Sequence, residues 1–226
     1  MASCIYGKHN MKALPVSREP QKPAVRHISI AGISYCGSTV FGALLGGLPG
    51  VCNIGESYWL TRCKSPGTPE ILDFAAGPEA GVLQCVNCGL ECDYITPDFR
   101  RSLQKDPSRW YQKIGAQMGT EVVVSSEKNY KKIVACDPEL DCDAIIVFKS
   151  PAQAWWSNVK KFNDSRFNPE RDLQSYLKKW GSVYKFFLED LYVTRNKSFL
   201  FFDDFCARPK PYLQALALQL DLPPPP

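Results

Sequence analysis

The sequence predicts an α/β protein, a three-layer sandwich in which helices cover both faces of a central, mostly parallel sheet. Three observations lead to this prediction. Short apolar runs rich in β-branched residues alternate along the chain with longer amphipathic stretches. The first apolar run passes through a glycine-bearing, P-loop-like turn into a helical pattern, giving a strand-loop-helix unit. Apolar residues make up 45% of the 226 residues, enough for a sizeable buried core.

The elements can be assigned in order from their periodicity. Continuous apolar runs predict strands at residues 27–31, 51–54, 121–125, 144–148 and 198–202. Apolar residues at helical spacing predict helices at residues 38–48, 98–118, 169–192 and 209–220. The proline-bearing residues 1–26 are expected to form a flexible leader. Residues 27–226 are expected to form one domain, with a cysteine-bearing loop insert at about residues 57–97.

Charge and hydropathy exclude several classes of partner. The formal net charge is +4, which is mildly basic and sufficient for a local anion site, but small for a surface that coats nucleic acid. We expect no membrane partner, because the longest apolar stretch is short and is broken by glycine and proline. The first residues carry no apolar signal-peptide core, so a cytoplasmic location is expected. The ten cysteines are then better explained as thiols or metal ligands than as disulfides.

The turn at Gly32–Thr39 (GISYCGST) has the features of a phosphate-binding loop. It follows a predicted strand and opens a predicted helix, so backbone N–H groups and the helix N-terminus would face an anion. Its glycines match the Walker spacing, but Ser38 occupies the place of the lysine that nucleoside triphosphatases need on their phosphates. An ordinary kinase or ATPase is therefore disfavoured, and a glycine turn without a ligand remains the alternative.

Residues 31–56 resemble the 5′-phosphosulfate loop of sulfotransferases that use 3′-phosphoadenosine 5′-phosphosulfate (PAPS). The resemblance rests on the loop itself, on Leu44-Leu45 and Pro49 after it, and on Gly55-Glu56. Tyr35 and Cys36 stand where the family commonly has a basic residue and a serine. The resemblance implies that the sulfonated phosphate binds at five consecutive residues, Tyr35, Cys36, Gly37, Ser38 and Thr39.

A second stretch, remote in sequence, resembles the 3′-phosphate site of the same family. An apolar strand at residues 145–148 is followed by Lys149-Ser150-Pro151, and Ser157 lies eight residues after the lysine. Lys149 stands for the family's arginine. A cation at a strand end and a hydroxyl on the next helix can together hold one phosphate. With its weaker parallels, at residues 123–128 and 202–205, the resemblance spans residues 28–222.

Sulfuryl transfer requires a group that accepts the acceptor's proton. His9 lies in the leader, and His27 lies at the start of a strand, away from the carboxyl ends where ligands gather in α/β sheets. Glu56 coincides with the glutamate that serves as base in several related sulfotransferases, so the resemblance implies that role here. Lys128 is a candidate electrostatic helper, because the segment around it resembles one that lies near the cofactor or acceptor in related enzymes.

Four cysteines in the insert form a candidate metal site. Cys85, Cys88 and Cys92 are closely spaced, and Cys63 lies upstream. Four thiolates can hold Zn²⁺ tetrahedrally, whereas free or paired thiols near the acceptor pocket are the alternative.

Together these observations predict a sulfotransferase that moves a sulfuryl group from PAPS to a hydroxyl or amine of a small-molecule acceptor, such as a natural product or metabolite. The product would be adenosine 3′,5′-bisphosphate. Two alternatives stay open at this point. One is a nucleotide-dependent small-molecule kinase, and the other is a non-catalytic nucleotide-binding module of the same fold.

Overall fold

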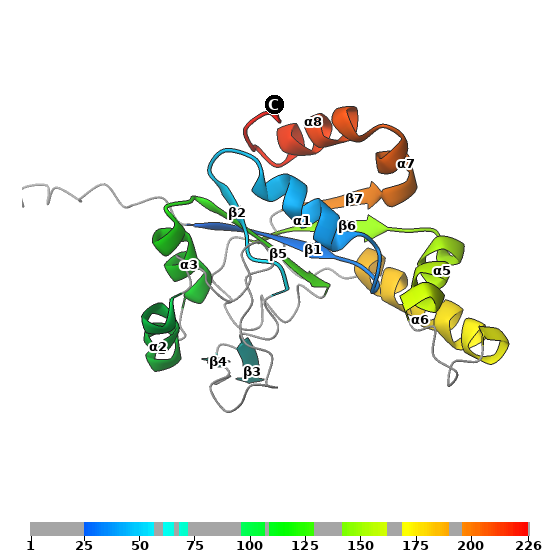
Figure 1. The fold of residues 1–226 in the computed structure, drawn as a ribbon, viewed down its shortest axis with the longest axis horizontal. Coiled ribbons are helices and arrows are strands. Elements are labelled where there is room, and N and C mark those ends of the chain that lie inside the picture. The colour runs from blue at the N-terminus through cyan, green and yellow to red at the C-terminus, as the bar shows by residue number, and fades with distance from the viewer. Residues whose placement is uncertain are drawn as a thin grey trace, which may run out of the picture.

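A computed structural model describes residues 25–56, 61–65, 68–71, 96–106, 109–128, 142–161, 169–189 and 196–225. Its centre is a sheet of five parallel strands in the order β2-β5-β1-β6-β7 (Figure 1). The strands are β1 (Arg26–Ala31), β2 (Val51–Asn53), β5 (Val122–Lys128), β6 (Cys142–Phe148) and β7 (Lys197–Phe201). The α/β prediction is confirmed, and every described strand of this sheet is parallel to its neighbours.

A small antiparallel hairpin lies apart from this sheet. It consists of β3 (Thr61–Ser65) and β4 (Thr68–Ile71), with Thr61 opposite Ile71. It falls within the segment that the sequence analysis assigned to a loop-rich insert. The predicted insert therefore contains some regular structure.

Helices cover both faces of the central sheet. Figure 1 shows α1, α7 and α8 on one side and α3 and α6 on the other. Their bounds are α1 (Ser38–Gly46), α2 (Pro97–Lys105), α3 (Trp110–Met118), α5 (Pro151–Lys161), α6 (Pro169–Glu189), α7 (Phe202–Ala207) and α8 (Pro209–Gln219). The helix expected over residues 98–118 is in fact two helices. Pro107 lies in the sequence between them, and proline disfavours a continuous helix.

Two apolar clusters hold the layers together. In the larger one, Phe41 of α1 and Phe205 of α7 meet with ring centroids 4.6 Å apart, and Phe187 of α6 packs into the same cluster. In the smaller one, Trp110 and Tyr111 of α3 pack beside the edge formed by β2 and β5. None of the described helices has the length and hydropathy needed to span a membrane.

The folded domain includes residues that the sequence analysis assigned to the leader. Val25 and Arg26 are both buried, and Arg26 is the first residue of β1. Arg26 forms an ion pair with Asp143 of β6 at 2.5 Å, and Asn196 Nδ2 donates to the other carboxylate oxygen of Asp143 at 2.8 Å. Val25 and Arg26 therefore belong to the described fold, and the division into a leader and one domain otherwise stays a prediction.

His27 is a structural residue of the core, as its position at the start of β1 predicts. It is fully buried, with Nε2 hydrogen-bonded to Ser125 Oγ at 2.9 Å and its ring 4.0 Å from that of Tyr111. Burial lowers its pKa to about 3, because the charged imidazolium would lose its hydration. His27 is therefore neutral in the folded protein near neutral pH.

This lowered pKa predicts a pH-dependent stability. Below its ordinary pKa of 6.5 the histidine takes up a proton in the unfolded chain but not in the folded one, so acid favours unfolding until the folded pKa is reached. His27→Gln should remove a contribution of about 1.4 kcal/mol per pH unit in that window. Urea unfolding at about pH 7.5 and about pH 5 measures it. Equal pH dependence in both proteins would contradict the assignment.

Candidate functional site

The carboxyl ends of all five strands lie along one edge of the sheet, because the strands are parallel. β1 is the central strand, with β5 on one side and β6 on the other. The chain leaves β1 through α1 toward β2 on the β5 side, whereas β6 lies on the opposite side. Ligands of open α/β sheets bind where the connections diverge in this way. The loop after β1 therefore occupies the expected binding position.

This loop, Gly32–Thr39, has the backbone of an anion cradle. Tyr35 and Gly37 adopt positive φ angles of 65° and 101°, and Gly37 caps the start of α1. Gly37 has no side chain with which to cap the helix, and the first turn contains no acidic residue. The first N–H groups of a helix lack internal partners and carry partial positive charge, so they are suited to bind an anion.

Glycine is required at position 37 for two reasons, its positive φ angle and the lack of space for a side chain. A Cβ atom there would collide with the ring of Phe202, the first residue of α7. Phe202 thus packs directly against the start of α1. Residues 202–205, which weakly resemble a segment of the sulfotransferase family, therefore include a residue that lies beside the loop, Phe202.

Lys149 connects the two motifs that lie far apart in the sequence. Its Nζ donates to the Tyr35 carbonyl at 3.3 Å and to Ser157 Oγ at 3.0 Å. Its ammonium also lies 5.1 Å from the centroid of the Phe202 ring, a cation–π distance. The structure therefore brings Lys149 and Ser157 together beside the Gly32–Thr39 loop.

Two aromatic residues of α6 position Lys149. Trp180 Nε1 donates to the Lys149 carbonyl at 3.1 Å, and the Tyr184 hydroxyl donates to the Val147 carbonyl at 2.8 Å. Burial raises the pKa of Tyr184, so its hydroxyl keeps the donated proton. The sequence analysis did not single out these roles. The signal that could have found them is the four-residue spacing of the two aromatic residues, which places both on one helix face.

Glu56 lies at the same edge of the sheet. After β2 the chain continues along β5, with Ile54 N–H donating to Val124 at 2.9 Å and Ser126 N–H donating to the Gly55 carbonyl at 2.8 Å. These hydrogen bonds hold the segment against β5, so Glu56, which is half-buried, lies near the carboxyl end of that strand. Lys128 ends β5 opposite Ala31 of β1, so its backbone is at this edge, while its side chain lies outside the described part of the structure.

The other loop residues predicted to bind the donor differ in their exposure to solvent. Ser38 is buried and Thr39 is exposed, both in the first turn of α1. Cys36 does not reach the cradle with its thiol, because its side chain is fully buried, and its N–H donates to the Ile33 carbonyl at 3.1 Å. Its side chain instead belongs to the larger apolar cluster.

The candidate zinc site lies largely outside the described residues. This holds for Cys85, Cys88 and Cys92, while Cys63 is described only as a backbone position in β3. Within the described ranges, no group of three or more metal-ligating side chains comes together. The zinc prediction therefore stays a prediction.

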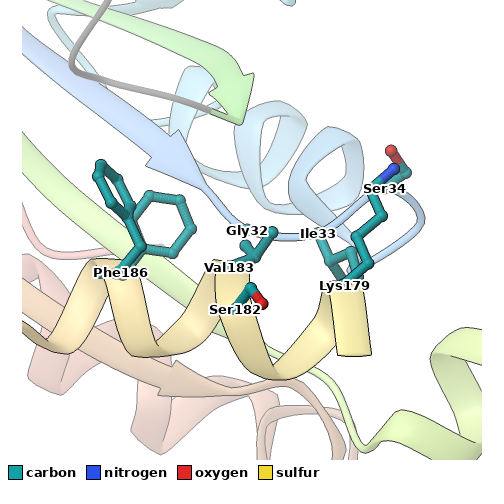
Figure 2. A pocket seen from close by; sticks show the side chains of 8 residues that line it. Gly32, Ile33, Ser34, Lys179, Ser182, Val183 and Phe186 are labelled. Carbon is teal, nitrogen blue, oxygen red and sulfur yellow. The ribbon is translucent and has the colours of Figure 1, made fainter. Parts of the chain in front are cut away.

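A cavity of about 390 Å³ lies between the loop and α6. Loop residues 32–34 form one wall, and Val183 and Phe186 of α6 form much of the other (Figure 2). Lys179 and Ser182 of α6 add polar groups to its lining. The lining thus includes the first three residues of the loop, whereas no residue of α1 lines the cavity.

Comparison with known proteins identifies the fold. No family model matches the chain, and no curated protein sequence matches it. The sulfotransferase domain of the Synechococcus PCC 7002 olefin synthase superposes with a TM-score of 0.58 at 16% identity, covering 91% of this chain and 76% of that one. The sulfotransferase domain from the curacin biosynthetic pathway gives a TM-score of 0.56 at 17% identity, with 89% and 76% covered.

A sugar kinase from Janibacter sp. HTCC2649 superposes less well, with a TM-score of 0.44 at 16% identity, covering 88% of this chain and 96% of that one. The two sulfotransferase domains agree in fold with the family that the sequence resembles. The chain therefore has the sulfotransferase fold.

Proposed function

We propose that this protein is a PAPS-dependent sulfotransferase that acts on a hydroxyl or amine of a small molecule. The observation that carries the proposal is the position of Lys149, whose ammonium contacts both the phosphate-binding loop and Ser157. Two candidate anion-binding elements thereby lie side by side. A nucleotide with phosphates at both its 5′ and 3′ positions fits such a pair.

The chemistry of the side chains fits each part of this donor. The uncapped start of α1, with the hydroxyls of Ser38 and Thr39, suits the 5′-phosphosulfate. Lys149 and Ser157 offer an ammonium and a hydroxyl to the 3′-phosphate. The ring of Phe202, which lies against Gly37, offers an aromatic surface beside both.

The donor, when bound, supplies a sulfuryl group on a phosphate leaving group. Glu56 is the residue we assign to take the proton from the acceptor as its oxygen or nitrogen forms a bond to sulfur. The bond from sulfur to the 5′-phosphate oxygen breaks, and its electron pair stays with the phosphate. The loop amides and Ser38 hold that phosphate and stabilise the charge that it gains.

Binding of the product nucleotide tests the proposal before any acceptor is known. Calorimetry should detect adenosine 3′,5′-bisphosphate in the absence of Mg²⁺. Lys149→Met should weaken this binding by roughly 10- to 100-fold, because a hydrogen-bonded cation on a phosphate is lost. Ser157→Ala should weaken it less.

Lys160→Met is the matched control for this experiment. Lys160 is exposed on the same helix as Ser157 and lies over the Trp156 ring at 5.6 Å, so its replacement should leave binding unchanged. Binding of ATP with Mg²⁺, without binding of the bisphosphate, would instead favour a kinase. Tight bisphosphate binding without transfer from labelled PAPS to any of a broad acceptor panel would favour a non-catalytic module.

A further inference from the structure

The phosphate-binding loop contains no cation of its own. Its sequence, GISYCGST over Gly32–Thr39, has neither lysine nor arginine. A transfer step at this loop would nevertheless place several anionic oxygens there and would add negative charge to the leaving phosphate. Fixed positive charge aimed at such a group is a large source of rate acceleration. Any side chain that reaches the loop from another element is therefore of interest.

Lys179 of α6 is such a side chain. It shares one helix face with Ser182, Val183 and Phe186, at spacings of three, four and seven residues, and all four line the cavity beside the loop. Figure 2 shows the Lys179 side chain extending from α6 toward Ser34, which lines the same cavity.

Within the ranges that the structure describes, the charge of Lys179 has no neutralising partner. Among the described residues no carboxylate forms an ion pair with it. Lys185, six residues further along the same helix, is different, because it pairs with Glu189 at 3.7 Å. Lys149 is different again, since its ammonium already contacts the Tyr35 carbonyl and Ser157.

We propose that Lys179 supplies the missing cation of the phosphate-binding loop from α6, across the cavity, and contacts the sulfonated phosphate of the donor. This inference rests on the proposed function. It assigns separate tasks to two lysines. Lys149 binds beside Ser157, and Lys179 meets the group that is transferred and the phosphate that it leaves.

A second explanation for Lys179 makes a different prediction. The methylene stem of a lysine can cover apolar side chains while its ammonium stays in water. Val183 and Ile33 line the cavity and could be covered in this way. In that case the methylene stem would contribute to packing, and the charge would contribute nothing to donor affinity or turnover. Methionine has an unbranched apolar side chain and no charge, so Lys179→Met separates the two explanations.

The first readout is affinity measured by calorimetry, with inorganic pyrophosphate and with PAPS as probes. Lys179→Met should weaken both by about 10-fold, as expected for the loss of one charge-assisted contact. Lys179→Arg should stay within about threefold of the parent protein, because it keeps the charge. Lys178→Met is the control, since Lys178 is exposed and does not line the cavity.

The second readout is sulfuryl transfer from labelled PAPS at saturating donor. Lys179→Met should lower turnover by roughly 10- to 100-fold, with partial recovery in Lys179→Arg. Melting temperatures should be unchanged, because Lys179 is exposed. Affinities and turnover equal to those of Lys178→Met would overturn the inference.

Failure of the proposed function would look different from failure of this inference. If the parent protein binds pyrophosphate in a Lys179-dependent manner but transfers no sulfuryl group, the role of Lys179 as the cation of the loop is supported and the sulfotransferase assignment falls. If transfer occurs and Lys179→Met retains both affinity and rate, the assignment stands and the role of Lys179 falls.

Discussion

Glu56→Gln is expected to slow sulfuryl transfer by about 10²–10⁴-fold while leaving the affinity for adenosine 3′,5′-bisphosphate unchanged. Glutamine keeps the size and one carbonyl oxygen of the side chain but cannot accept the acceptor's proton. In the proposed complex, the start of α1, Lys149 and Ser157 hold the nucleotide. Its affinity should therefore be the same in Glu56→Gln as in the parent protein. Turnover with labelled PAPS and calorimetry with the bisphosphate measure the two quantities separately.

Glu121→Gln is the matched control for this substitution. Glu121 is exposed and immediately precedes β5, at the amino edge of the sheet, whereas Glu56 lies near the carboxyl end of the same strand. The same chemical change at the far edge should leave turnover intact. Undiminished turnover in Glu56→Gln would remove this residue from the mechanism. Weakened bisphosphate binding would assign it to the nucleotide site instead.

Asp143→Ala should destabilise the fold by about 3–5 kcal/mol, because it leaves the Arg26 guanidinium buried without its counter-charge. The Asp143 carboxylate is fully buried and accepts from Arg26 and from Asn196. These contacts join the first residue of β1 to β6 and to the residue before β7. Urea unfolding followed by circular dichroism gives the free energy of unfolding.

Two further variants test the cause of this loss. The double variant Arg26→Leu, Asp143→Leu removes both charges and should recover much of the stability, since apolar pairs often replace buried ion pairs without penalty. Lys113→Ala removes an exposed ion pair with Asp106, at 2.5 Å, and should cost less than about 1 kcal/mol. If Asp143→Ala proves as mild as Lys113→Ala, the buried pair does not stabilise the fold as described.

The sequence predicts most of the sheet and the parts of the site that depend on local pattern. β1, the loop and α1 follow from an apolar run, two glycines and a helical period, whereas Lys149 and Ser157 were singled out by their resemblance to a family motif. The prediction of helix ends was less accurate where apolar residues keep a helical spacing across an interruption. The single helix predicted over residues 98–118 is divided into α2 and α3 in this way. Periodicity reports which face is apolar, but it does not report where a helix is interrupted.

Other features of the site depend on tertiary packing, which no local pattern contains. Phe202 lies against Gly37 because β7 ends near the start of α1, and Trp180 meets the Lys149 carbonyl because α6 packs against the end of β6. Lys179 is one of two adjacent lysines, and only the fold distinguishes it from Lys178. The sequence likewise places Cys36 in the loop without showing that its thiol is directed inward.

The parallel sheet separates the residues that maintain the domain from those that could contact ligands. The buried pair of Arg26 with Asp143, and the neutral His27, belong to the amino halves of their strands. The loop, Glu56 and Lys149 follow the opposite ends. Substitutions that alter acceptor choice should therefore be tolerated with little loss of folding free energy. Such a scaffold is evolvable, because new specificities can accumulate at one rim while the other preserves the architecture.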